Sequence, residues 1–149
     1  MKNKVYSTQR GKQFNSILKL IEMGNKELAK RELRKILNHY YYNEAALSIY
    51  VKLLLDGEFD GVKELAEDYL DNREIAYYYA LVLKYSGDIE NSKELFKYSY
   101  NEGKTRSLIQ YIVILIKEEN YEEAIQMMEG PAKRGYKDAV EKLAEYNYK

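Results

Sequence analysis

Two helical patterns joined by a short turn recur along this chain about every 31 residues, and this repetition restricts the possible folds more than any other feature. The clearest unit runs from Arg73 to Gly103 and has its turn at Ser86-Gly87-Asp88. On both sides of the turn, apolar and small residues recur at spacings of three and four, which places them on one face of each helix. Because such a hairpin cannot bury its apolar face alone, the sequence predicts a stack of neighbouring hairpins.

The same spacing predicts which residues face inward. The central unit contributes Ala76, Tyr79, Ala80 and Leu83 from its first helix and Ile89, Ser92, Leu95, Phe96 and Ser99 from its second. The preceding unit contributes Ala46, Ile49, Tyr50 and Leu53, then Phe59, Val62, Leu65, Ala66 and Tyr69. These stripes predict an all-α protein whose hairpins share a continuous core.

Turn and capping residues predict the helix boundaries. Gly24 and Gly87 each follow the last periodic residue of a helix and suit a left-handed C-terminal position. Asn43 and Asp88 precede helical patterns, where their side chains can accept hydrogen bonds from the first backbone N–H groups. Gly130-Pro131 is expected to end or kink the helix that contains it, because proline removes a backbone donor and crowds the preceding turn.

Three stretches of the chain do not follow the hairpin pattern clearly: residues 111–116, 137–146 and 1–9. The run from Tyr111 to Ile116 also suits a buried strand, because β-branched residues dominate it, but the repeat context favours a helix. Residues 137–146 are expected to form a C-terminal capping helix that faces inward through Val140, Leu143 and Ala144. Residues 1–9 are basic and polar, and we expect them to be flexible.

Charge and composition exclude several classes of function. Lys plus Arg and Asp plus Glu both number 24, so the formal net charge is zero, without the basic excess of a nucleic-acid-binding domain. The chain has no cysteine and a single histidine, His39, which excludes thiol chemistry and a histidine-based metal cluster. No glycine-rich phosphate loop follows a strand pattern. We therefore expect no enzymatic activity, no metal site and no cofactor.

Hydrophobicity bears on the location of the protein. The longest apolar run, from Tyr111 to Ile116, is far shorter than the about 20 residues needed to cross a bilayer. Asn15, Ser16 and Lys19 interrupt the apolar residues near the N-terminus, so we expect no signal peptide. The expected location is the cytoplasm, without a membrane partner.

Corresponding positions of the hairpins carry similar residues. The turn glycine is Gly24, Gly57 and Gly87, with Glu119 in the fourth hairpin. The second helices carry a small residue at Ala29, Ser92 and Ala124 (Val62 in the second hairpin), and a larger residue four places later at Leu33, Ala66, Phe96 and Met128. In these positions the hairpins resemble tetratricopeptide repeats, and the segment from Ala132 to Tyr146 is similar to the junction of the related Sel-one-type repeats. The resemblance implies one domain over residues 1–149: a right-handed superhelical solenoid of about four helix-turn-helix repeats plus a C-terminal capping helix.

The resemblance also implies protein binding along the concave face, which the first helices of the hairpins line. On that side the sequence places Leu47, Val51, Leu54, Tyr77, Leu81, Tyr85, Ile109, Val113 and Ile116. Large apolar groups in a contiguous row are unusual on an uncovered surface, so we expect these residues to form a partner-binding groove. Its occupant is left open between a partner peptide or helix, a second copy of the chain, and the chain's own N-terminal segment around Val5 and Tyr6.

Three functions are compatible with such a groove. The first is an adaptor or chaperone-like module that binds a peptide or helix of a partner protein. The alternative is a self-associating structural protein, a homodimer through the groove. Single-stranded nucleic-acid binding through tyrosine stacking is least favoured, because acidic residues are interspersed among the lysines. The tyrosines at 77, 78 and 79 fit either packing between hairpins or partner contact, with Tyr79 the expected core residue and Tyr77 facing the groove.

Overall fold

The computed structural model describes residues 9–57 and 59–133, and this part of the chain is helical apart from its turns. Its eight helices are α1 (Gln9–Glu22), α2 (Lys26–Tyr40), α3 (Glu44–Leu55), α4 (Asp60–Glu67), α5 (Arg73–Tyr85), α6 (Ile89–Asn101), α7 (Arg106–Lys117) and α8 (Tyr121–Lys133). The described ranges contain no strand, and the run from Tyr111 to Ile116 lies inside α7. The prediction of an all-α protein is confirmed for these residues.

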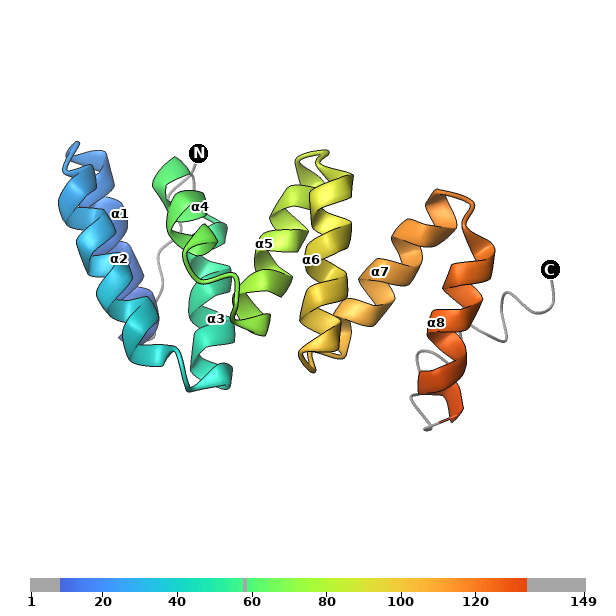
Figure 1. Ribbon diagram of the computed structural model, residues 1–149. Coiled ribbons are helices and arrows are strands. Elements are labelled where there is room, and N and C mark those ends of the chain that lie inside the picture. The colour runs from blue at the N-terminus through green and yellow to red at the C-terminus, as the bar shows by residue number, and fades with distance from the viewer. Residues whose placement is uncertain (1–8, 58, 134–149) are drawn as a thin grey trace.

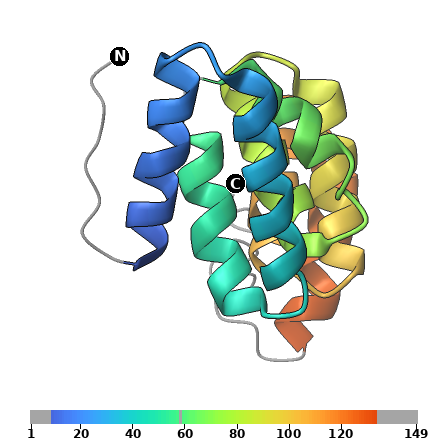
Figure 2. The same cartoon turned by 90° about the vertical axis from the view of Figure 1, so that its left-hand side faces the viewer.

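Consecutive helices pair as hairpins, and the hairpins lie side by side in a row from α1/α2 to α7/α8 (Figure 1). Seen from the α1/α2 end, α1 and α3 lie toward one side and α2 and α4 toward the other (Figure 2). Along the row, α1 packs on α3, α3 packs on α5 and α2 packs on α4. At the far end the packing changes, because the backbone of α7 lies against α6 rather than against α5.

Four helices, α1, α5, α6 and α7, end in the same backbone arrangement. In each, a left-handed residue is followed by a residue whose N–H donates to the carbonyl five positions earlier, at 2.8–2.9 Å. The left-handed residues are Gly24 (φ 77°), Gly87 (φ 96°), Gly103 (φ 105°) and Glu119 (φ 61°). This confirms the predicted turns at Gly24 and Gly87. Gly57 does not have a positive φ; a Cβ atom there would lie 3.2 Å from the Phe14 ring, so a close approach favours glycine instead.

Side chains cap the helices that begin at the predicted Asn and Asp positions. Asn43 Oδ1 accepts from the N–H of Ala46 at 3.2 Å, and Asp88 Oδ1 accepts from the N–H of Asn91 at 3.3 Å. Asn72 does the same at the start of α5, since its Oδ1 accepts from the N–H of Glu74 at 2.9 Å. These bonds satisfy backbone donors that have no partner within the helix.

The last described helix differs from the prediction. α8 continues through Gly130 and Pro131 to Lys133, so of the two expected effects of the proline, an end or a kink of the helix, the end is wrong. Proline removes one backbone donor and crowds the preceding turn, which weakens a helix without requiring it to stop. The predicted capping helix at residues 137–146, most of the Sel-one-type segment and residues 1–8 lie outside the described residues.

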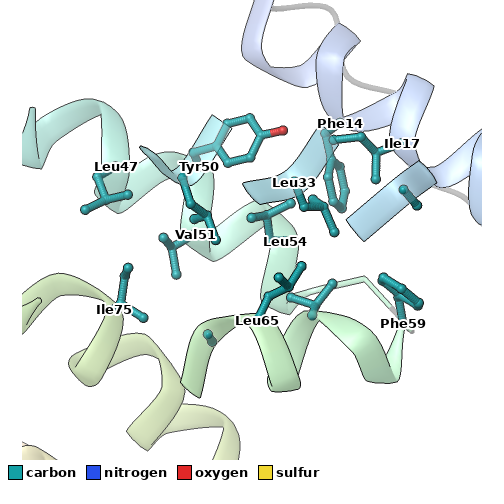
Figure 3. Packing of buried hydrophobic residues seen from close by; sticks show 14 of the residues in the cluster. Phe14, Ile17, Leu33, Leu47, Tyr50, Val51, Leu54, Phe59, Leu65 and Ile75 are labelled. Carbon is teal, nitrogen blue, oxygen red and sulfur yellow. The ribbon is translucent and has the colours of Figure 1, made fainter. Parts of the chain in front are cut away.

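Buried apolar side chains form two clusters along the row of hairpins. The first joins α1 to α5 and includes Phe14, Leu33 and Leu54 (Figure 3). The second joins α5 to α8 and includes Phe96 and Met128. Tyr78 and Leu95 pack against both clusters, so the core is continuous through the central hairpin. The small and large positions of the second helices are all buried: Ala29, Ser92, Ala124, Val62, Leu33, Ala66, Phe96 and Met128.

Two of the four residues predicted to face inward on α3 are not fully buried. Ile49 is 49% exposed and Leu53 is half-buried, whereas Leu47 is completely buried. Ala46 and Tyr50 are buried as predicted. Most residues of α3 are apolar, so the spacing of its apolar residues does not identify a single inner face.

Candidate functional site

Four of the nine residues predicted for the groove belong to the protein's own core. Leu47, Val51 and Leu54 are at most 2% exposed and pack in the first cluster. Val51 and Leu54 line a small internal space together with residues of α2, α4 and α5 (Figure 3). Tyr77 is also buried, and its ring meets that of Phe96 at a centroid distance of 5.9 Å. For these four, the expectation of an uncovered position is wrong.

Packing between the helices explains this difference. α3 lies between α1 and α5 and contacts both, so residues on either side of α3 are covered. α7 leans on α6 instead, and its backbone makes no comparable contact with α5. The sides of α5 and α7 that correspond to the buried side of α3 are therefore left partly open.

The five remaining predicted residues lie on this open part. Leu81, Ile109, Val113 and Ile116 are half-buried, and Tyr85 is 81% exposed. Leu81 and Tyr85 are one turn apart on α5, and Ile109, Val113 and Ile116 follow a single stripe of α7. We call this surface the α5–α7 face, and define it by these five residues together with Lys84, Gln110 and Lys117.

Two lysines, Lys84 and Lys117, belong to the α5–α7 face and were not among the residues predicted for the groove. Lys84 Nζ donates to Oε1 of Gln110 at 2.8 Å, which links α5 to α7. Burial lowers the pKa of Lys84, and the positive charge of Lys117 lowers it further. The signal was present in the sequence, because Lys84 lies three residues after Leu81 and Lys117 lies four residues after Val113. Both side chains are charged, so the apolar pattern that predicted the groove does not contain them.

The N-terminal end of α5 is closed by a polar network. Lys104 Nζ donates to both carboxylate oxygens of Glu74, at 2.8 and 3.0 Å. The ammonium group of Lys104 also lies 5.2 Å from the ring centre of Tyr77. The hydroxyl of Tyr78 is 2.8 Å from Oγ of Ser48. Lys104 with Glu74 and Tyr78 with Ser48 therefore connect neighbouring hairpins at this end of α5.

Other possible sites are occupied by contacts within the protein. Glu118 pairs with Lys93 at 3.0 Å, and Glu123 accepts a hydrogen bond from the hydroxyl of Tyr111 at 2.8 Å. Within residues 9–57 and 59–133, no group of three His, Cys, Asp or Glu side chains is arranged to hold a metal ion. His39 is exposed in the last turn of α2, with its ring edge-on to that of Tyr40.

A polar hollow lies at the start of α3 and α5. Tyr41, Tyr42, Glu44 and Arg73 are among its lining residues. Arg73 Nη2 donates to Oε2 of Glu44 at 2.6 Å, and the hydroxyl of Tyr41 donates to Oδ2 of Asp71 at 2.7 Å. Both bonds join neighbouring hairpins, so they serve the packing of the row. Tyr42 is 94% exposed and makes a useful control for Tyr85.

Comparison with known proteins found no matching family model, no matching curated protein and no matching solved structure. The described helices include none with the length and apolar character that a membrane span requires. The α5–α7 face is therefore interpreted from its own geometry: an apolar stripe on two helices, an exposed tyrosine, and two lysines at its edge.

Proposed function

We propose that this protein is a protein–protein interaction module, an adaptor or chaperone-like protein that binds a peptide or helix of a partner on the α5–α7 face. The observation that carries this proposal is the open position of Leu81, Tyr85 and Val113 beside a core that covers the equivalent residues of α3. A tyrosine combines a large apolar ring with a hydroxyl and is enriched where proteins meet. The proposed role is binding without catalysis and without a cofactor.

The proposed architecture is a tetratricopeptide-like solenoid. Its support is the spacing of polar contacts between hairpins, which join residues close to one predicted repeat apart. Ser48 with Tyr78, Tyr41 with Asp71 and Glu74 with Lys104 are all 30 residues apart. Repeats that stack side by side bring equivalent positions together in this way. The proposed setting is the cytoplasm, with which the absence of cysteine is compatible.

Self-association is the second candidate, and the exposure of Tyr85 favours it as well. Two copies could each cover the α5–α7 face of the other, because a two-fold interface uses the same patch on both subunits. Nucleic-acid binding has less support, because the net charge is zero and acidic residues are interspersed among the lysines, pairing with Lys30, Lys93 and Lys104.

A random peptide library displayed on phage tests the proposal against the full-length protein. The decisive comparison is Tyr85→Glu with Tyr42→Glu, since both replace an exposed tyrosine by a carboxylate. Wild type and Tyr42→Glu should enrich the same peptides, whereas Tyr85→Glu should enrich none of them. If wild type enriches no peptide, or if both variants lose binding equally, the peptide-binding proposal fails.

Light scattering over a range of protein concentrations separates the second candidate from the first. A homodimer through the α5–α7 face should double in mass as concentration rises, and Tyr85→Glu should return it to the monomer. A monomeric mass at every concentration would exclude self-association through this face.

A further inference from the structure

The charges on the α5–α7 face are positive and have no counter-charge within the described residues. Lys84 makes its hydrogen bond to the neutral amide of Gln110, and neither Lys84 nor Lys117 forms an ion pair in residues 9–57 and 59–133. Elsewhere in the same hairpins, lysines of similar burial are paired. Lys93 pairs with Glu118 at 3.0 Å and Lys104 with Glu74 at 2.8 Å.

Two carboxylates of these helices, Glu74 on α5 and Glu118 just after α7, are paired with other lysines. Glu74, on the same helix as Lys84, is almost completely buried against Lys104. Glu118 directly follows Lys117 in the chain, and its side chain reaches Lys93 on α6. Lys84 reaches Gln110 on α7, and Lys117 lies seven residues after Gln110 on the same side of that helix. The positive charge of Lys117 lowers the pKa of Lys84.

We propose that the partner of the α5–α7 face is an acidic, apolar peptide segment, whose carboxylates pair with Lys84 and Lys117 while its apolar side chains lie on Leu81, Tyr85 and Val113. This inference rests on the proposed function and names the chemistry of the partner. A carboxylate placed between the two lysines removes their mutual repulsion. Because Lys84 is partly withdrawn from water, its bond to a carboxylate is worth more than that of a fully exposed lysine.

Apolar contact alone does not distinguish one apolar peptide from another, and the two lysines determine which peptide charge is preferred. A basic peptide would bring like charges together on the face, which opposes binding. A neutral peptide would leave Lys84 partly dehydrated without a counter-charge. The acidic peptide is the only one of the three that improves the electrostatic environment of both lysines.

Three fluorescent synthetic peptides test the inference on the full-length protein. They share Leu and Phe at the same positions and differ only in carrying Glu, Gln or Lys between them. The Glu peptide should bind, with an affinity that falls as salt is raised, and the Lys peptide should not bind. The double change Lys84→Glu with Lys117→Glu should weaken binding of the Glu peptide about tenfold or more and should allow the Lys peptide to bind.

A matched control separates the local effect from a change in net charge. Lys52→Glu with Lys63→Glu changes the net charge by the same amount on exposed positions of α3 and α4. This control should leave the order of the three peptides unchanged. If control and test variants behave alike, or if wild type binds none of the peptides, the inference is overturned.

Three further outcomes would identify a different occupant or a different specificity. Equal binding of all three peptides, abolished by Tyr85→Glu, would overturn the acid preference and leave the proposed function standing. A concentration-dependent dimer that Tyr85→Glu dissociates would show a second copy on the face and overturn the proposal. In the full chain, replacement of Asp138, Glu141 and Glu145 by amides tests the C-terminal segment: a gain in affinity for the Glu peptide would show that segment as the occupant and also overturn the proposal.

Discussion

Lys104 Nζ lies 2.8 and 3.0 Å from the two carboxylate oxygens of Glu74, and both side chains are largely buried, with 15% and 7% of their surface exposed. The pair joins the start of α5 to the turn before α7, so it connects two neighbouring hairpins. Two opposite charges taken out of water stabilise a fold only while they remain together.

Removal of either partner should therefore destabilise the protein strongly. We expect Lys104→Met or Glu74→Met to lower the free energy of unfolding by up to about 3 kcal/mol, because each leaves one buried charge without its partner. The double variant should recover most of this loss, since two apolar side chains need no counter-charge. Urea denaturation of all four proteins gives the coupling energy. Additive losses in the double variant would show that the pair does not act as a unit.

Replacement of Glu119 by glycine should stabilise the protein. It is the only residue other than glycine with a positive φ in the described ranges, at 61°, and it occupies the same turn position as Gly24 and Gly87. A side chain in the left-handed region costs about 1–2 kcal/mol, so Glu119→Gly should stabilise the protein by about 1 kcal/mol. The reverse change, Gly87→Glu, is the control: a Cβ there meets no atom within 4 Å, so its cost comes from the backbone. Thermal melting should move in opposite directions for the two variants.

The same turn shows how far the sequence predicts this fold. Equivalent positions carry Gly24, Gly87 and Glu119, and the repeat pattern identified the turn even where the glycine is missing. The inner face of α3 was not predictable in the same way, because a helix that is apolar on most sides has no single stripe. Whether a residue predicted for the groove is exposed depends on how closely α7 packs against α5. Packing between hairpins sets this distance, and the spacing of apolar residues within one helix does not predict it.

Replacement of Tyr50 by phenylalanine should also stabilise the protein. Its side chain is completely buried in the first cluster, and its hydroxyl has no hydrogen-bond partner among residues 9–57 and 59–133. Burial also raises the pKa of Tyr50 above its usual range. A buried polar group without a partner is costly, so Tyr50→Phe should stabilise the protein by about 1 kcal/mol. Tyr79→Phe is the matched control and should destabilise by a similar amount, because the hydroxyl of Tyr79 donates to Oε1 of Glu67 at 2.6 Å.

Alkaline pH should unfold the protein through its tyrosines. Burial, with the hydrogen bond to Glu67, raises the pKa of Tyr79 to about 12, and the bond to Asp71 raises the pKa of Tyr41 to about 12. An unfolded tyrosine titrates near pH 10, so stability is fully present below pH 10 and is lost as pH rises toward 12. Urea denaturation at several pH values should show this decline. Tyr79→Phe should make the decline less steep, and an unchanged slope would contradict the role of Tyr79.

Lys84 should show the opposite dependence on pH. Burial and then the charge of Lys117 place its pKa in the folded protein below 10.5, so its charged form is less favourable in the folded than in the unfolded chain. Below its pKa in the folded protein, charged Lys84 lowers the free energy of unfolding. This cost is removed as the pH rises through that pKa toward 10.5, so the protein becomes more stable over this range. Lys84→Met should remove this rise in stability with pH. At neutral pH the variant should be at least as stable as wild type, because the hydrogen bond to Gln110 is worth less than the cost of burying the charge. The same variant should lose affinity for the acidic peptide. A variant that is both less stable and unchanged in binding would show that Lys84 serves the packing of α5 on α7 and not the partner.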